Sequence, residues 1–478
     1  MRYWDIANQI VPVAGAGARP SRWRNLARRL VGNRYPAVDD HTIDVDVATA
    51  LASRFVVAPE DPGDDGWPST LHCIGSLGAG GAERQLVNLL TNLASRGHHR
   101  QTLLTMHPLE GDGAHYLPLL EDAHVQVKVN NQICDEGVEL IRRNADIVRL
   151  IRKMPSSFNA WTLDLWVDIA LAKPQIAHFW LDHTNIWGAP AALLAGVPTV
   201  FVSTRNVHPE NFPYLYAPYM RPWYSWLAQS SRVRFINNSR AGADSYAEWI
   251  GMPRSRIDVV LNGVDLRHLK PATPEERRQL RAEIGMPDDA VGVVGAFRMS
   301  EEKRPLLFVE AFARAAADNP ALHGVLMGDG PLLQQVKDRA RALGVGDRFH
   351  VLGRRTDLPK VLSSMDVFLH TAWWEGTPNV VLEAQQLELP VVVCKAGGAA
   401  DAVAHGGTGF LVERDDEEAL HQRLAEVLAD LPQWKQRARQ GPEFIARRFG
   451  VDRMVDESYA LHVKAIDARD PQQAFAVA

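Results

Sequence analysis

Two glutamates, Glu375 and Glu383, bound the segment of this chain whose residue types best suit ligand chemistry. The apolar run before them, Val367–His370, has the composition of a buried strand, and Val381–Leu387 has the pattern of a helix. Glu375 would lie in the loop and Glu383 on the helix, so two carboxylates can flank one ligand. The alternative is that both are ordinary capping or solvent-facing glutamates.

The start of the predicted helix offers a place for an anion. Thr377 is expected to be the N-cap and Pro378 the first helical residue, where a missing N–H has no cost. The amides of Asn379, Val380 and Val381 would then be unpaired donors at the positive end of the helix dipole. This arrangement suits a diphosphate.

Two cations follow another predicted strand. Arg298 and Lys303 come shortly after the apolar run Val291–Gly295. Together at a strand end, they could neutralise a diphosphate leaving group, which gains negative charge as its bond breaks. A solvated basic loop is the alternative, and the spacing alone does not distinguish the two.

Glycine-rich turns end further apolar runs. Gly78–Gly81 follows Thr70–Ile74 and resembles a phosphate-binding loop, although it lacks the spacing of the dinucleotide fingerprint. Gly328–Pro331 and Val351–Arg354 end two later runs. A lone turn of this kind is not diagnostic.

The sequence supplies two series of strands to position these turns and cations. From Ser69 onward apolar runs alternate with helical patterns, which implies right-handed βαβ units and parallel sheets. The predicted strands are Thr70–Ile74, Gln101–Thr105, Gln175–Trp180, Thr199–Ser203 and Val233–Asn237, then Val291–Gly295, Gly324–Gly328, Phe349–Leu352, Val367–Leu369 and Val391–Val393. We therefore predict an α/β protein with two tandem Rossmann-like domains. Its ligands should lie in a deep inter-domain cleft at the carboxyl ends of the strands.

Shifts in composition suggest the boundaries. An N-terminal extension would span 1–68, the two domains 69–268 and 269–450, and a C-terminal helix that packs back toward the first domain, with a tail, 451–478. The extension ends in an acidic linker, Pro59–Gly66. It also predicts a short basic amphipathic helix, with Arg19, Arg22, Arg24, Arg28, Arg29 and Arg34 around Trp23, Leu26 and Leu30. This helix could dock on an anionic membrane surface or pack on the main body.

The composition excludes several classes of protein. A chain of 478 residues suits two or three domains, and its net charge of −5 gives no support for nucleic-acid binding. Three scattered cysteines indicate neither a disulfide framework nor a cysteine-based zinc site and fit the cytoplasm. No apolar run is long enough for a membrane span, and the N-terminus lacks a secretory signal. We expect a cytoplasmic protein, or one peripheral on the inner face of the cytoplasmic membrane.

Several motifs together resemble the retaining nucleotide-sugar glycosyltransferases of family 4 (glycosyl transferases group 1), which have the GT-B fold. The matching segments are Gly80–Arg84 (G-G-A-E-R), Leu261–Asp265 (P-N-G-V-D), Arg298 with Lys303 (G-R-x4-K), Glu375–Glu383 (E-x7-E) and Gly406–Val412. The resemblance covers roughly residues 70–465. It implies an acceptor-side first domain and a nucleotide-sugar-binding second domain.

The implied activity is retaining transfer of a sugar from a nucleotide-diphosphate sugar, expected to be a UDP-sugar, to a glycan or lipid-linked saccharide. The implied setting is bacterial surface polysaccharide or lipopolysaccharide biosynthesis. The nucleotide-sugar is the donor substrate, and we expect no cofactor. No metal is expected either, because Arg298, Lys303 and the helix start would carry the leaving-group charge.

The resemblance also implies roles for single residues. Arg298 and Lys303 would bind the donor diphosphate and Glu375 would hold the sugar, which makes these three the expected catalytic residues. Glu383 would accept hydrogen bonds from the ribose hydroxyls. The expected donor-binding residues are Gly80, Gly81, Gly330, Leu352, Arg354, Asn379, Val380 and Glu383.

The chain departs from the family pattern in small ways at Leu261, which stands in the Pro position, and at Arg304, which replaces a frequent Gly, and in one way that matters more. Members often carry a second histidine two residues after the one that matches His178, and this chain has Trp180 there. Asp182 or His183 could substitute, although an ordinary loop role is the alternative for each. The departure puts the sugar-side contacts in doubt.

Two other segments have competing interpretations. Asp44–Asp46 matches the D-x-D metal signature of the other glycosyltransferase fold, but it lacks that context and is expected to be a chance match. The aromatic segment Phe212–Leu227 is a candidate for binding a lipid-linked saccharide, with simple packing as the alternative.

Two alternative functions remain. A nucleotide-sugar 2-epimerase also uses two Rossmann-like domains, but it would need acid/base carboxylates in the first domain, where no convincing set occurs. A degenerate transferase acting as a scaffold is opposed by the intact Arg298, Lys303, Glu375 and Glu383.

Overall fold

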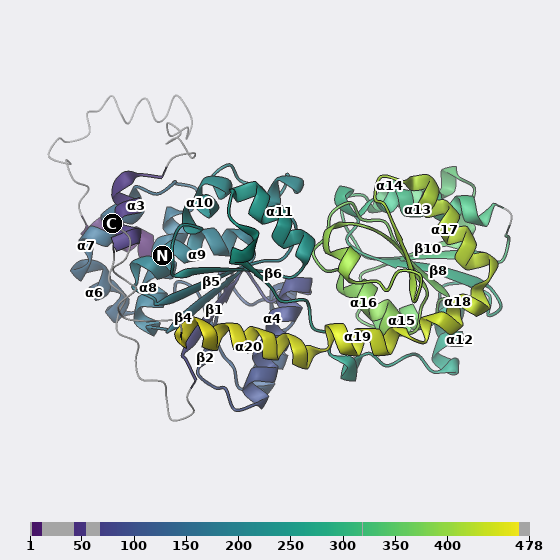
Figure 1. The fold of residues 1–478 in the computed structure, drawn as a ribbon, viewed down its shortest axis with the longest axis horizontal. Coiled ribbons are helices and arrows are strands. Elements are labelled where there is room, and N and C mark those ends of the chain that lie inside the picture. Colours follow the sequence, from purple (N-terminus) through teal and green to yellow (C-terminus); the bar gives the residue numbers. More distant parts are fainter. Residues whose placement is uncertain (1, 12–42, 54–66, 318, 468–478) are drawn as a thin grey trace.

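The computed structural model describes residues 2–11, 43–53, 67–317 and 319–467. Two parallel sheets lie end to end along the long axis, each covered by helices on both faces (Figure 1). This confirms the predicted α/β architecture with two Rossmann-like sheets. Among the described residues, no helix combines the length and apolarity needed to cross a bilayer.

The first sheet has seven strands in the order β3-β2-β1-β4-β5-β6-β7. Their bounds are β1 (Thr70–Ile74), β2 (Gln101–Thr105), β3 (Gln126–Val129), β4 (Ile176–Trp180), β5 (Thr199–Thr204), β6 (Val233–Asn237) and β7 (Ile257–Val259). The central strands β1, β4 and β5 are buried along their whole length, as parallel strands covered on both faces must be.

Helices cover both faces of this sheet. On one face lie α6 (Asp135–Arg143), α7 (Ala145–Arg152), α8 (Asn159–Ala172), α9 (Asp182–Leu194), α10 (Met220–Leu227) and α11 (Arg240–Ile250). On the other lie α4 (Gly81–Ser95), α5 (Leu117–Asp122) and α20 (Val451–Asp467). Figure 1 shows α4 and α20 together below the sheet and α9 to α11 above it.

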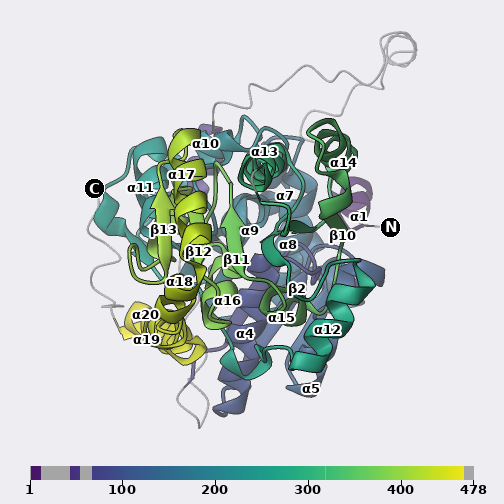
Figure 2. The same cartoon turned by 90° about the vertical axis from the view of Figure 1, so that its right-hand side faces the viewer.

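The second sheet has six strands in the order β10-β9-β8-β11-β12-β13. They are β8 (Val291–Ala296), β9 (Leu322–Met327), β10 (Phe349–Gly353), β11 (Val367–His370), β12 (Val391–Cys394) and β13 (Gly409–Val412). One face is covered by α13 (Pro305–Ala316), α14 (Leu333–Ala342) and α17 (Glu417–Ala429). The other is covered by α12 (Pro274–Glu283), α15 (Leu358–Ser363), α16 (Asn379–Gln386) and α19 (Gly441–Phe449), with α18 (Leu431–Ala438) between α17 and α19 in the chain. Figure 2 looks onto this domain and shows α13 and α14 above the sheet and α12 and α15 below it.

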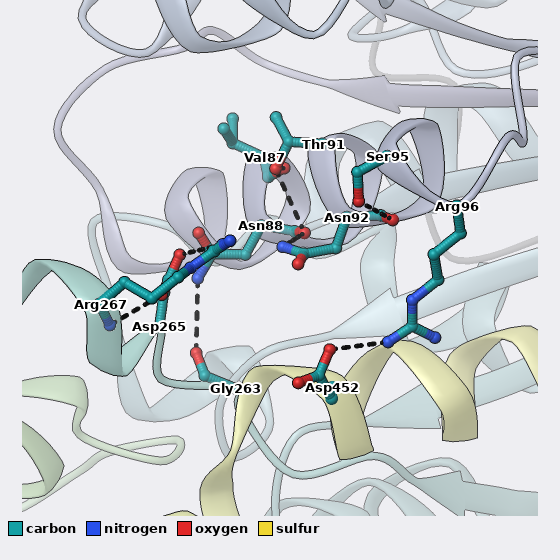
Figure 3. Close-up of polar contacts among 10 residues, drawn as sticks. All are labelled: Val87, Asn88, Thr91, Asn92, Ser95, Arg96, Gly263, Asp265, Arg267 and Asp452. Atoms are coloured by element: carbon teal, nitrogen blue, oxygen red, sulfur yellow. Dashed lines mark hydrogen bonds and ion pairs between the residues drawn. The ribbon is translucent and has the colours of Figure 1, made fainter.

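Helix α20 returns from the second domain and packs on α4 of the first (Figure 1). Arg96 at the end of α4 binds Asp452 (2.8 Å) and Asp456 (2.5 Å) of α20. Asn88 of α4 donates to the carbonyl of Gly263 in the inter-domain connection (3.5 Å; Figure 3). These contacts hold the connection and α20 against the same helix.

Two helices of the extension, α1 (Tyr3–Ile10) and α3 (Val45–Ser53), pack on the first core. The Asp44–Asp46 pair lies here, where both carboxylates contact Lys153. The predicted basic helix and acidic linker lie outside the described residues.

Candidate active site

A cavity of about 550 Å³ lies between the two domains. Loops that follow β1, β4, β5, β8 and β11 line it, so it sits at the carboxyl ends of both sheets, where parallel α/β folds bind ligands. A second cavity of about 750 Å³, lined mostly by the second domain, adjoins it. The two share Ala79, Ala296, Phe297, Arg298 and Leu358, so they form one cleft.

An ion pair occupies the wall of the first cavity. Lys303 Nζ lies 2.5 Å from Glu375 Oε1, and His370 Nε2 lies 3.3 Å from the same oxygen. Burial by itself would raise the pKa of Glu375, but Lys303 and His370 lower it to about 2. Glu375 is therefore ionised at any working pH and can accept hydrogen bonds from sugar hydroxyls.

Helix α16 begins one residue later than predicted. Its N-cap is Pro378, and the predicted cap, Thr377, donates its hydroxyl to Asn238 O across the domain junction (2.6 Å). The Val381 amide, expected to be unpaired, donates to Pro378 O (3.1 Å). These two expectations were wrong, since the helix begins at Asn379 and the Thr377 side chain is directed to the other domain. Asn379, whose amide is the first of the helix, still lines the cavity.

Glu383 lies one helical turn further along α16 and is buried. Its Oε1 accepts from Arg84 Nη1 of α4 at 2.5 Å. Its Oε2 is enclosed and has no hydrogen-bond partner among the described residues. Burial raises the pKa of Glu383, and Arg84 offsets this only in part. Glu383 lines the first cavity, and a buried carboxylate oxygen without a partner is rare in folded proteins.

Asn262 connects the two domains at the base of the cleft. Its Nδ2 donates to Thr377 O (3.1 Å) and to Asn379 Oδ1 (2.7 Å), and its Oδ1 accepts from Arg205 Nη2 (2.7 Å). The Asn379 side chain is thereby turned toward the first domain, so a ligand would meet its backbone.

The other predicted site residues lie along the cleft with one exception. Gly80, Gly81 and Val380 line the first cavity, and Gly330 and Arg354 line the second. Arg354 also binds Asp112 of the first domain (2.7 Å). Leu352 packs against the core of the second domain and is not among the described residues that line either cavity.

Trp180, at the departure from the family pattern, is buried below the cavity. The next residue, Leu181, has a φ of 75°, a conformation that costs a non-glycine residue energy and is often found at functional sites. Asp182 lines the cavity but accepts from Tyr224 (2.7 Å) and Tyr246 (2.5 Å). His178 Nε2 forms a buried hydrogen bond with the Ser203 hydroxyl (2.7 Å).

The aromatic segment reaches across to the second domain. Tyr214 donates to Glu302 Oε1 (3.0 Å), and the Arg298 guanidinium lies 5.3 Å from the Tyr214 ring. Phe212 and Leu215 line the cavity. The segment therefore both packs, through its buried residues, and contributes to the cleft wall.

The cleft residues that sequence reasoning missed include two arginines, Arg84 and Arg205. Arg84 was visible as the last residue of Gly80–Arg84, although its pairing with Glu383 was not. Arg205 carried no local signal beyond a cation that follows a predicted strand.

Known protein families and proteins resemble this chain in sequence. The family model "Glycosyltransferase Family 4" matches residues 79–268, and "Glycosyl transferases group 1" matches residues 276–443. The Vi polysaccharide biosynthesis protein VipC/TviE of Salmonella typhi is 29% identical over 80% of this chain and 69% of its own length. The UDP-Gal:alpha-D-GlcNAc-diphosphoundecaprenol alpha-1,3-galactosyltransferase of Escherichia coli is 30% identical over 63% of this chain and 80% of its own.

A solved structure has the same fold. Anabaena Alr3699/HepE in complex with UDP matches with a TM-score of 0.66 at 23% identity, over 83% of this chain and 100% of that one. The family models, the two relatives and the solved structure all indicate the same family and fold. The chain belongs to the group 1 glycosyltransferases and is a glycosyltransferase with the GT-B fold.

Proposed function

We propose that this enzyme transfers a sugar from a UDP-sugar to a glycan or lipid-linked saccharide in bacterial surface polysaccharide or lipopolysaccharide biosynthesis. The names of the relatives support this: one is a Vi polysaccharide biosynthesis protein, and another uses UDP-Gal and a diphosphoundecaprenol-linked acceptor. Anabaena HepE has been solved with UDP-glucose. A cytoplasmic location fits the three free cysteines.

The observation that carries the proposal is the Lys303–Glu375 pair at the head of α16. It supplies an ionised carboxylate for the sugar and a cation for the diphosphate within one cavity wall. Glu383 Oε2, which has no partner in the described part of the chain, would accept from the ribose on the same wall. A nucleotide-sugar presents the matching groups, a sugar, a diphosphate and a ribose, in that order.

The chemistry follows from these positions. As the bond from the sugar C1 to the diphosphate breaks, its electron pair passes to the diphosphate oxygen, and Arg298 and Lys303 stabilise the charge without a metal. Lys303 engages Glu375, which favours a role in holding the sugar over one as a covalent nucleophile. We therefore infer a same-face displacement with retention, in which the acceptor oxygen bonds to C1 and its proton passes to the leaving diphosphate.

Product stereochemistry tests this mechanism. An α-linked UDP-sugar should yield an α-linked product first, which proton NMR detects from the anomeric coupling during the first turnovers. A β-linked first product would contradict retention. It would leave the assignment of the donor untouched.

A further inference from the structure

Two cleft arginines, Arg205 and Arg298, form no ion pair with a described carboxylate; Arg298 is exposed, whereas Arg205 is partly buried. Arg205 follows β5 on the acceptor-side wall, with its Nη2 on Asn262 and its face 4.9 Å from the Trp180 ring. Its Nε is enclosed and has no hydrogen-bond partner among the described residues. By contrast, the cleft cations Arg84 and Lys303 are held by glutamates.

This arrangement costs the free protein stability. Burial lowers the pKa of Arg205 to about 9, and no acid in the described part of the chain offsets this shift. The acid on the same wall, Asp182, is occupied by the hydroxyls of Tyr224 and Tyr246. A partly buried cation with an enclosed, unsatisfied N–H is costly unless a ligand completes it.

The position of Arg205 points to the anion concerned. Asn262 joins its guanidinium to Thr377 O and Asn379 Oδ1 at the start of α16. The Arg205 carbonyl also packs against Gly376, where a Cβ would lie only 2.1 Å from it. Arg205 therefore faces, from the opposite domain, the place where the first amides of α16 suit a phosphate.

We propose that Arg205 binds the diphosphate of the nucleotide-sugar from the acceptor-side domain, opposite Arg298 and Lys303. This inference rests on the proposed function. The diphosphate then joins the two domains, and the charge that forms on it when the C1–oxygen bond breaks is stabilised from both walls. Nη2 of Arg205 keeps its hydrogen bond to Asn262, and this bond fixes the direction of the guanidinium.

Binding of UDP and of uridine by wild type, Arg205→Gln and Arg205→Lys tests the inference. Calorimetry should show UDP affinity about 10- to 100-fold lower in Arg205→Gln, the effect of losing a charged hydrogen bond. Arg205→Lys should lose less, because it keeps the charge without the fork. Uridine, followed by ligand-observed NMR, should bind all three within about twofold, which also shows that the variants are folded.

The remaining outcomes separate the possible roles. Unchanged UDP affinity with a raised KM for a short-chain lipid-diphosphate-linked saccharide would assign Arg205 to the acceptor's phosphates and overturn the inference. Unchanged UDP affinity and unchanged KM would make Arg205 purely structural and overturn it as well. A wild type that binds none of UDP, GDP and ADP would instead overturn the proposed function.

Discussion

The pKa values of the two motif glutamates shift in opposite directions, although burial raises both. Lys303 and His370 more than offset the burial of Glu375, whose pKa falls to about 2. Arg84 does not fully offset the burial of Glu383, whose pKa stays raised. Glu383 is therefore the first of the two to lose its charge as the pH falls.

This difference predicts how nucleotide binding depends on pH. Glu383→Gln should bind UDP about tenfold less tightly than wild type at pH 8, because an amide accepts ribose hydroxyls less strongly. The difference in UDP affinity between the two proteins should narrow as the pH falls through the raised pKa of Glu383. Wild type then also lacks the negative charge at this position. Calorimetry from pH 8 to pH 5 measures it. With 2′-deoxy-UDP the two proteins should differ less; an equal gap would remove Glu383 from the ribose.

The Lys303–Glu375 pair predicts a separation of stability from activity. Lys303→Met or Glu375→Gln alone should cost about 3 kcal/mol of unfolding free energy, because each leaves a buried charge or polar group without its partner. The double variant should recover most of that loss in urea unfolding yet transfer no sugar. Recovery of turnover in the double variant would show that the pair has only a structural role.

At the scale of elements, the loop before α16 is fixed by close packing against the first domain. A Cβ at Gly376 would lie 2.1 Å from Arg205 O and 2.8 Å from the Asn238 amide. The backbone must shift to admit it, which moves Glu375 away from the sugar.

Gly376→Ala should therefore lower kcat by about 100-fold or more, since displacement of a reacting group by an ångström has effects of this size. Gly75→Ala is the matched control, because a Cβ there meets no atom of the described residues within 4 Å. Steady-state kinetics of both variants checks this. Equal kcat values would mean that the loop adapts freely.

The sequence predicted the buried strands well because period and composition are local properties. It missed β3 and β7, since β3 is an edge strand with exposed alternate residues and β7 has three residues. Three further features were not predicted, for one reason: the start of α16, the Arg84–Glu383 contact and the Arg205–Asn262 contact. Each depends on residues far apart in the chain, and no local pattern encodes such a meeting.

At the scale of the whole molecule, α20 ties the C-terminal end of the described chain to the first sheet through buried histidines. His462 of α20 lies 3.3 Å from His178 of β4, and the His72 ring of β1 lies 5.2 Å from that of His178. Burial lowers the pKa of all three, that of His462 to about 4. The folded state therefore holds them neutral.

Stability should accordingly fall in acid. Between pH 6.5 and pH 4 the unfolded chain binds the proton that folded His462 refuses, so stability is full above pH 6.5 and is lost below it. Protonation of His462 in the unfolded chain should lower the free energy of unfolding by about 1.4 kcal/mol per pH unit in this range. Urea unfolding at pH 7.5 and pH 5.5 should show a smaller difference in His462→Leu than in wild type. His99→Leu, at an exposed histidine, should behave as wild type; an unchanged difference in His462→Leu would contradict the account.

The most direct test of the whole account is nucleotide release from a panel of UDP-, GDP- and ADP-sugars by wild type and Glu375→Ala. We predict slow release from one UDP-sugar by wild type, faster release with an acceptor saccharide, and none by Glu375→Ala, which should still bind UDP. Equal release by both proteins, or none from any donor even with acceptors present, would contradict the catalytic role of this cleft.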